Sequence, residues 1–92
     1  MTKSQIINIT KIVEEMKNIE ITKEDQQIYN IVYQIAKERK NKNITQKQLE
    51  KMTNIPQTTI SRIETFIEIP TLPTLMKILN ALNLNISITQ EN

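Results

Sequence analysis

Polar side chains able to recognise another molecule gather on one short predicted helix, residues 56–65. Apolar positions on this segment fall at helical spacing, so the polar ones share the opposite side. Those polar residues are Gln57, Thr58, Ser61 and Arg62. Gln can bond bidentately to adenine, Arg to guanine or a phosphate, and the hydroxyl side chains to base edges or thymine methyls. This chemistry is that of reading a nucleic acid.

Several kinds of catalysis are excluded by residue types that the sequence lacks. There is no His and no Cys, which removes imidazole bases, thiol nucleophiles, zinc sites and disulfides. There is no Gly, so a phosphate-binding loop and a dinucleotide-binding turn cannot form. No paired carboxylates suited to acid–base chemistry stand on one predicted element. The sequence therefore predicts a protein that is not an enzyme and uses no cofactor or metal.

Positive charge is concentrated in the middle of the chain, although the net charge is only +2. Residues 37–62 carry seven Lys or Arg against two Glu, whereas residues 1–25 carry four Lys against five acids. Such a basic region favours an acidic polymer as the partner. The apolar stretches are short and the N-terminus lacks the apolar core of a secretory signal, so we expect a cytoplasmic protein without membrane contact.

Hydrophobic periodicity predicts five helices around that basic region. They cover residues 4–17, 23–41, 45–53, 56–65 and 72–82. Thr22 and Asp25 are typical of a helix start, and Thr45 with Gln48 has the spacing of a capping box. We expect Asn54 to make a left-handed turn. Leu49 and Met52 are expected to face inward on the helix before that turn.

The fold class predicted is all-α, a four- to five-helix bundle with a helix-turn-helix, plus a short C-terminal β-strand. The strand is predicted from the alternation of apolar and polar residues over 84–88. Three regions follow: an amphipathic helical arm (1–21), a DNA-binding domain (22–84) and a strand or tail (85–92).

Two short helices joined by a tight turn, the second one polar on its outer side, suit the major groove of DNA. The run Ile44–Glu64 (ITQKQLEKMTNIPQTTISRIE) resembles the Cro and phage-repressor (Xre) family of helix-turn-helix domains. The match continues through Pro70 and Leu82 and covers about residues 28–84.

The resemblance implies a sequence-specific transcriptional regulator that binds operator DNA. Residues at the recognition positions are Gln57, Thr58, Ser61 and Arg62. Residues expected against the DNA backbone are Gln46, Lys40, Lys42, Lys47 and Lys51. Arg39 and Glu64 fall where the family often pairs an Arg on its first helix with a Glu after the recognition helix.

The sequence departs from the family pattern in two places. Glu50 stands where the family prefers Ala, and its carboxylate is expected to point outward. Phe66 replaces the Gly that usually ends the recognition helix, and Ile67 with Glu68 replaces basic residues common in the next loop. The usual contact of that loop with the DNA backbone is therefore not implied here.

The C-terminal tail narrows the resemblance to helix-turn-helix antitoxins of the HigA and HipB types. In those proteins the tail can pair between subunits, which makes Ile86 and Ile88 the expected seam of a homodimer. The function expected is a repressor that binds a palindromic operator as a dimer. The alternative is an antitoxin that acts mainly by neutralising a toxin protein. A purely structural packing of the helices, without DNA binding, stays open as a third interpretation.

Overall fold

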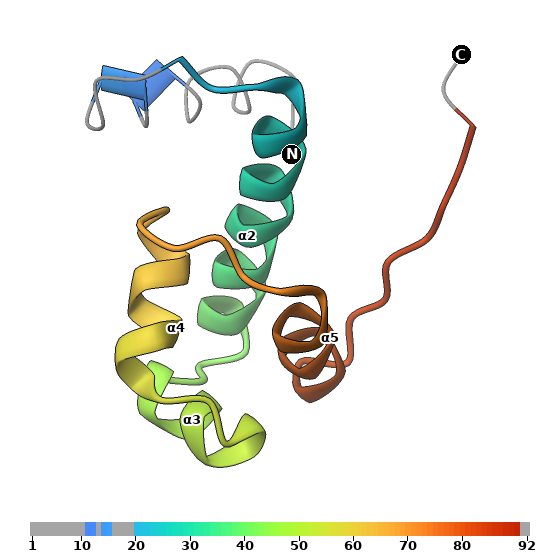
Figure 1. Ribbon diagram of the computed structural model, residues 1–92. Helices are drawn as coiled ribbons and strands as arrows, with labels where there is room; N and C mark the ends of the chain where they lie inside the picture. The colour runs from blue at the N-terminus through green and yellow to red at the C-terminus, as the bar shows by residue number, and fades with distance from the viewer. Residues whose placement is uncertain (1–10, 13, 16–19, 91–92) are drawn as a thin grey trace.

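The computed structural model describes residues 11–12, 14–15 and 20–90. Within it, helix α2 (Lys23–Asn41) is the longest element, and three shorter helices pack beside it. These are α3 (Gln46–Thr53), α4 (Gln57–Glu64) and α5 (Leu72–Ala81). Figure 1 shows α4 beside α2, α3 near the C-terminal end of α2, and α5 on the other side. The all-α class with a helix-turn-helix is confirmed.

Side-chain caps begin three of the four helices. Thr22 accepts a hydrogen bond from the backbone N–H of Asp25 at the start of α2. Thr45 and Gln48 form the predicted capping box at α3, with bonds of 3.0 and 2.8 Å. Thr71 caps α5 by accepting a hydrogen bond from the backbone N–H of Thr74. Each cap satisfies an N–H group that has no partner inside its helix, so the sequence specifies these helix starts locally.

The apolar faces of α2 to α5 meet in one core. Its most buried side chains come from all four helices and the residue after the last one: Val32, Leu49, Ile60, Ile78 and Leu82, each at most 2% exposed. Met52, predicted to face inward, is instead 51% exposed. The eight-residue α3 buries only a narrow stripe, and Leu49 with Thr53 fills it.

Many helices end with a residue in the left-handed conformation, usually Gly, and this chain has no Gly. Asn43, Asn54 and Asn83 adopt φ of 56–60° at the ends of α2, α3 and α5. Asn tolerates this conformation because its short polar side chain bonds locally. Phe66 takes the same role after α4 with φ of 63°. The backbone N–H groups of Phe66 and Ile67 bond to the carbonyls of Ile63 and Arg62, which closes a Schellman motif.

Packing of its ring supports Phe66 in this unfavourable conformation. The ring meets Tyr29 of α2 edge to face, with centroids 5.0 Å apart, beside buried Ile21. Left-handed backbone costs roughly 1–2 kcal/mol for a residue with a Cβ. An aromatic pair contributes about 0.5–1.5 kcal/mol beyond the area that it buries. The ring burial and the pair together therefore offset the backbone strain.

Replacing Phe66 separates these two effects. Phe66→Ala loses the ring contacts and keeps the strain, whereas Phe66→Gly loses the contacts and relieves it. We therefore expect the Gly variant to have a free energy of unfolding about 1 kcal/mol higher than the Ala variant. Urea unfolding of both variants measures the difference. An Ala variant as stable as the Gly variant would show that position 66 carries no backbone strain.

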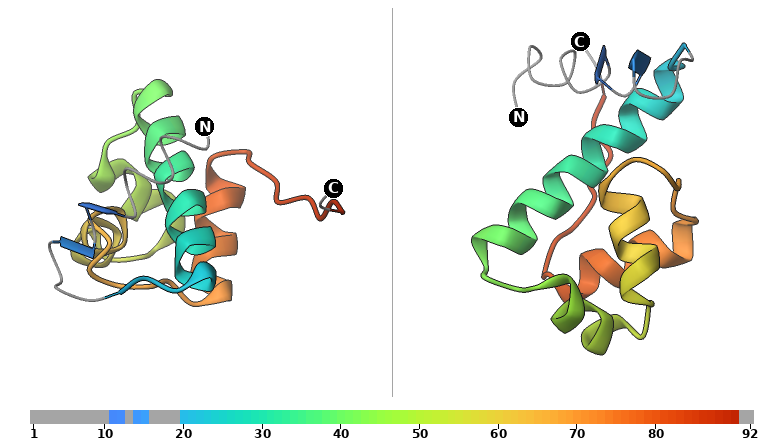
Figure 2. Two further views of the ribbon diagram at one scale, coloured as in Figure 1. Left: turned by 90° about the horizontal axis from the view of Figure 1, so that it is seen from above. Right: turned by 90° about the vertical axis from the view of Figure 1, so that its left-hand side faces the viewer.

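The C-terminal segment differs from its prediction. Residues 84–90 have no regular secondary structure, and none of residues 20–90 forms a β-strand. Alternating side chains can define a strand only when a second extended segment pairs with its backbone, and the described part of this chain offers none. Figure 2 shows the tail leaving α5 as a single extended segment, and its left-hand view shows the tail running outward from the helices.

Most of the predicted N-terminal helix lies outside the described residues. Residues 11, 12, 14 and 15 have helical backbone. The side chain of Glu14 accepts a 2.8 Å hydrogen bond from the backbone N–H of Ile21, just before α2. Across the described ranges, no helix is both long and apolar enough to cross a membrane.

Candidate nucleic-acid interface

Helices α3 and α4 are joined by a tight turn at residues 54–56. Thr53, buried at the end of α3, donates a hydrogen bond to the carbonyl of Leu49 and accepts one from the N–H of Ile55. Asn54 reverses the chain with its left-handed backbone, and Ile55 places a buried side chain in the core. The turn is therefore held by both hydrogen bonding and packing, which sets the orientation of α4.

The polar residues of α4 face away from the core. Ile60 and Ile63 are at most 2% exposed, so they define the inner side of the helix. On the outer side, Gln57, Thr58 and Arg62 are exposed and Ser61 is half-buried. Together with Gln46 of α3, these four residues line one open hollow. Five hydrogen-bonding side chains from two helices thus converge on a single surface.

A buried ion pair holds α4 against α2. Arg39 donates from Nε to Oε2 of Glu64 at 2.7 Å and from Nη2 to Oε1 at 2.8 Å. The two side chains are 8% and 9% exposed. Arg39 also donates to the carbonyl of Ile44, at the entry to α3, at 2.6 Å. One guanidinium therefore ties α2 to both helices of the helix-turn-helix.

Gln46 extends this ion pair to the exposed surface. Its Nε2 donates to Oε1 of Glu64 at 3.1 Å, on the oxygen that also accepts from Arg39. Gln46 also lines the open hollow together with Gln57. The buried pair thus orients a side chain that sequence analysis had placed against the DNA backbone, and brings it next to the candidate base-reading residues.

The four lysines predicted to contact the DNA backbone are all exposed. They lie at the end of α2 (Lys40), just after it (Lys42) and on α3 (Lys47 and Lys51). Lys42 differs from the others because its Nζ donates to the backbone carbonyl of Leu82 at the end of α5. A cation at a helix C-terminus is favoured by the helix dipole. This contact gives Lys42 a partner within the protein.

Glu50 has a role that its sequence position did not predict, although its carboxylate makes an exposed hydrogen bond, as an outward-pointing group would. Its Oε2 accepts a 3.0 Å hydrogen bond from the backbone N–H of Gln57, the first residue of α4. Pro56, the N-cap residue, makes no side-chain cap. Glu50 therefore caps the recognition helix from the helix before it. Its separation from Pro56 in sequence gave no local capping signal, so only the fold reveals this role.

A turn-linked pair of short helices, apolar inside and polar outside, defines a helix-turn-helix, the architecture of DNA-binding regulators. The model of the helix-turn-helix family matches residues 35–88, more than half of the chain. The protein belongs to this family, of the Cro and phage-repressor (Xre) type, and is a regulator that binds double-stranded DNA. No curated protein and no solved structure matches the chain.

Proposed function

We propose that this protein is a transcriptional repressor that reads a palindromic operator as a homodimer. The observation that carries the proposal is the convergence of Gln46, Gln57, Thr58, Ser61 and Arg62 on one open surface. Helix α4 has the exposed polar side and buried apolar side that a recognition helix needs to enter the major groove. A repressor of this kind would compete with transcription by occupying its site.

Each residue of this surface has a proposed role. Gln57, at the first position of α4, would bond to adenine, and Arg62 to guanine or a phosphate. Thr58 and Ser61 would contact base edges or thymine methyls. Gln46, Lys40, Lys47 and Lys51 would contact phosphates and set the register, with Lys42 contributing if it exchanges its bond to Leu82.

Selection of duplexes from a random DNA pool tests sequence reading directly. We expect the purified protein to enrich one palindromic motif. We also expect its affinity for that duplex to fall steeply between 50 and 200 mM salt, about 10- to 1000-fold, as the basic surface implies. Fluorescence anisotropy on the enriched and a scrambled duplex provides the measurement. Equal affinity for both duplexes would contradict sequence-specific regulation.

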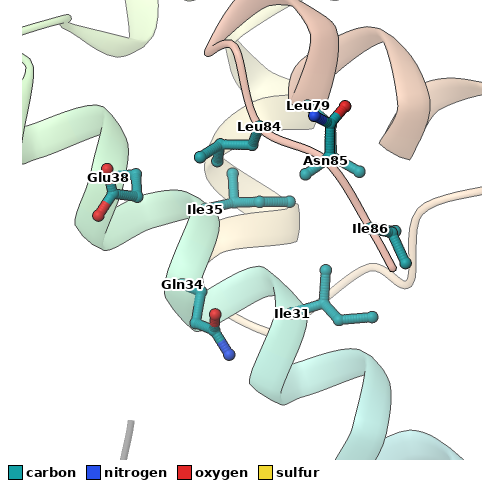
Figure 3. A pocket seen from close by; sticks show the side chains of 8 residues that line it. All are labelled: Ile31, Gln34, Ile35, Glu38, Leu79, Leu84, Asn85 and Ile86. Carbon is teal, nitrogen blue, oxygen red and sulfur yellow. The ribbon is translucent and has the colours of Figure 1, made fainter. Parts of the chain in front are cut away.

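The tail is the proposed seam of the homodimer. Ile88 is 99% exposed, and Ile86, at the edge of the tail next to α2, is 44% exposed in the single chain. Figure 3 shows that the tail and α2 border an apolar groove, with Ile31, Ile35 and Leu84 around it. Pairing of two tails would satisfy their backbone groups and cover these side chains, and it would supply the second extended segment that a strand requires.

Charge placed on the apolar positions of the tail should disrupt this dimer. Burial of one Ile side chain contributes about 1.5–3 kcal/mol. Ile86→Glu together with Ile88→Glu is therefore expected to weaken dimerisation at least tenfold. Ser87→Glu, on the other side of the tail, is the matched control. Sedimentation velocity reports the oligomeric state. A double variant that dimerises like the wild type would show that the dimer interface lies elsewhere.

A protein partner is the second candidate, since large apolar side chains are exposed around the start of α5. Ile67 and Leu72 are 66% and 67% exposed, with Ile69 and Met76 nearby in sequence. Exposed apolar patches mark interaction surfaces, which favours an antitoxin that binds a toxin protein. Co-expression with a growth-inhibiting protein encoded by a neighbouring gene tests this role. If the Leu72→Glu variant no longer protects growth but still binds DNA, the antitoxin role is supported. If protection of growth is lost when Gln57 is replaced, the role is contradicted.

A further inference from the structure

The carboxylate of Glu50 stands at the N-terminus of α4, the proposed recognition helix. It is half-buried, and Oε2 bonds the N–H of Gln57 at 3.0 Å. Gln57 is also one of the residues that line the hollow between α3 and α4. Glu50 thus touches the backbone of a candidate base-reading residue while it lies on a different helix.

A helix N-terminus attracts anions because its first N–H groups lack partners and the helix dipole adds partial positive charge. In a DNA complex the available anion is a phosphate, and phosphates lie along every sequence. Here Glu50 occupies the first N–H of α4 with an internal anion. Its charge is also not neutralised by an ion pair, because the only pair found within residues 20–90 joins Arg39 and Glu64.

We propose that Glu50 is a specificity-determining residue that excludes phosphate from the N-terminus of α4. This inference rests on the proposed DNA-reading function of the same surface. A phosphate held at Gln57 N–H would fix the helix on any duplex, whatever its bases. With Glu50 bonded to this N–H, binding of α4 to DNA depends more strongly on base contacts. The residues proposed to make them are Gln57, Thr58, Ser61 and Arg62. The cap also fixes the first turn from which Gln57 projects.

Glu50→Gln isolates the charge, because the amide oxygen can still accept the N–H of Gln57. Removal of one repulsive charge near a phosphate is expected to raise affinity for a random-sequence duplex about 3- to 10-fold at low salt. We expect a smaller gain on the duplex enriched by selection, whose complex is held by base contacts. The ratio of the two affinities should therefore fall. Glu24→Gln, the same change on the exposed first turn of α2, should leave both affinities unchanged.

Glu50→Ala provides the second variant, because it frees the N–H of Gln57 altogether. Its binding to the random duplex should have a salt dependence steeper by about one phosphate contact, a slope change of about 0.9. Circular dichroism and thermal unfolding report whether both variants fold. Should Ala unfold, Glu50→Gln alone still decides the matter.

The possible results distinguish the role of Glu50 from the proposed sequence-specific DNA binding. A wild type without preference for any duplex would overturn the proposed function, and with it the specificity role. A wild type that prefers its selected duplex, with Glu50→Gln unchanged on the random duplex, would overturn the role of Glu50 alone. Weaker binding of folded Glu50→Gln to both duplexes would show that the carboxylate assists binding, which also overturns the inference.

Discussion

The double variant Gln57→Ala, Arg62→Ala is expected to lose most of its preference for the selected operator duplex. Each well-placed base contact discriminates by about 1–3 kcal/mol, so two contacts together represent about 2–6 kcal/mol. Affinity for the operator should fall by about 30-fold or more at fixed salt. Affinity for a scrambled duplex should fall much less, because non-specific binding depends on phosphate contacts. Fluorescence anisotropy on both duplexes gives the two values.

A matched variant separates base reading from a general loss of surface polarity. Gln27→Ala with Lys77→Ala also removes one amide and one cation from exposed positions, on α2 and α5. Neither residue lines the recognition hollow. This control should bind the operator as the wild type does. An equal loss in both double variants, or an unchanged affinity in the first, would contradict the assignment of Gln57 and Arg62.

The largest loss in the free energy of unfolding from a single substitution is expected at the buried pair of Arg39 and Glu64. Arg39→Met leaves the Glu64 carboxylate buried without its cation, and Glu64→Met leaves the guanidinium without its anion. Removal of one partner from a buried pair costs about 3–5 kcal/mol, since the other charge is left uncompensated. Urea unfolding followed by circular dichroism should show this loss in each single variant.

The combined variant Arg39→Met, Glu64→Met should be far more stable than the sum of the two losses predicts. With both charges gone, two apolar side chains of similar volume fill the site, and such replacements are often neutral. Its remaining deficit comes from the carbonyl of Ile44 and the amide of Gln46, which lose their bonds. Lys77→Ala, an exposed change on α5, should stay within about 0.5 kcal/mol of the wild type. Additive losses would show that the pair is not coupled.

The double Met variant also tests how the core supports the recognition surface. Gln46 is oriented by Glu64 and reaches the hollow occupied by Gln57. A variant that keeps its stability and yet binds operator DNA more weakly would show that the buried pair positions Gln46. This readout distinguishes a role in DNA binding from a role in folding alone.

Local signals in the sequence determined most of the helix-turn-helix. The caps at Thr22 and Thr45, the left-handed Asn54 and the apolar spacing of Ile60 and Ile63 each act over a few residues. Such signals need no knowledge of the fold, because hydrogen bonds to neighbouring backbone and helical periodicity are short-range. The polar side of α4 followed directly from the same periodicity.

Contacts between distant residues were decided only by the tertiary structure. Glu50 reaches Gln57 because the turn folds α4 back beside α3, and Phe66 tolerates a left-handed backbone because Tyr29 of α2 packs on its ring. Met52 turned outward because α3 is too short to bury a second large side chain. These outcomes depend on which helices meet.

The tail shows the same division between sequence and fold. Its alternation of apolar and polar residues belongs to the sequence, but residues 84–90 form no strand because a strand exists only with a paired neighbour. What the chain determined by itself was each helix, its ends and its polar side. What the tertiary structure decided was the set of interactions between helices: the buried ion pair, the aromatic ring that supports a strained backbone, and the carboxylate that caps another helix. Such interactions form only after packing brings distant residues together.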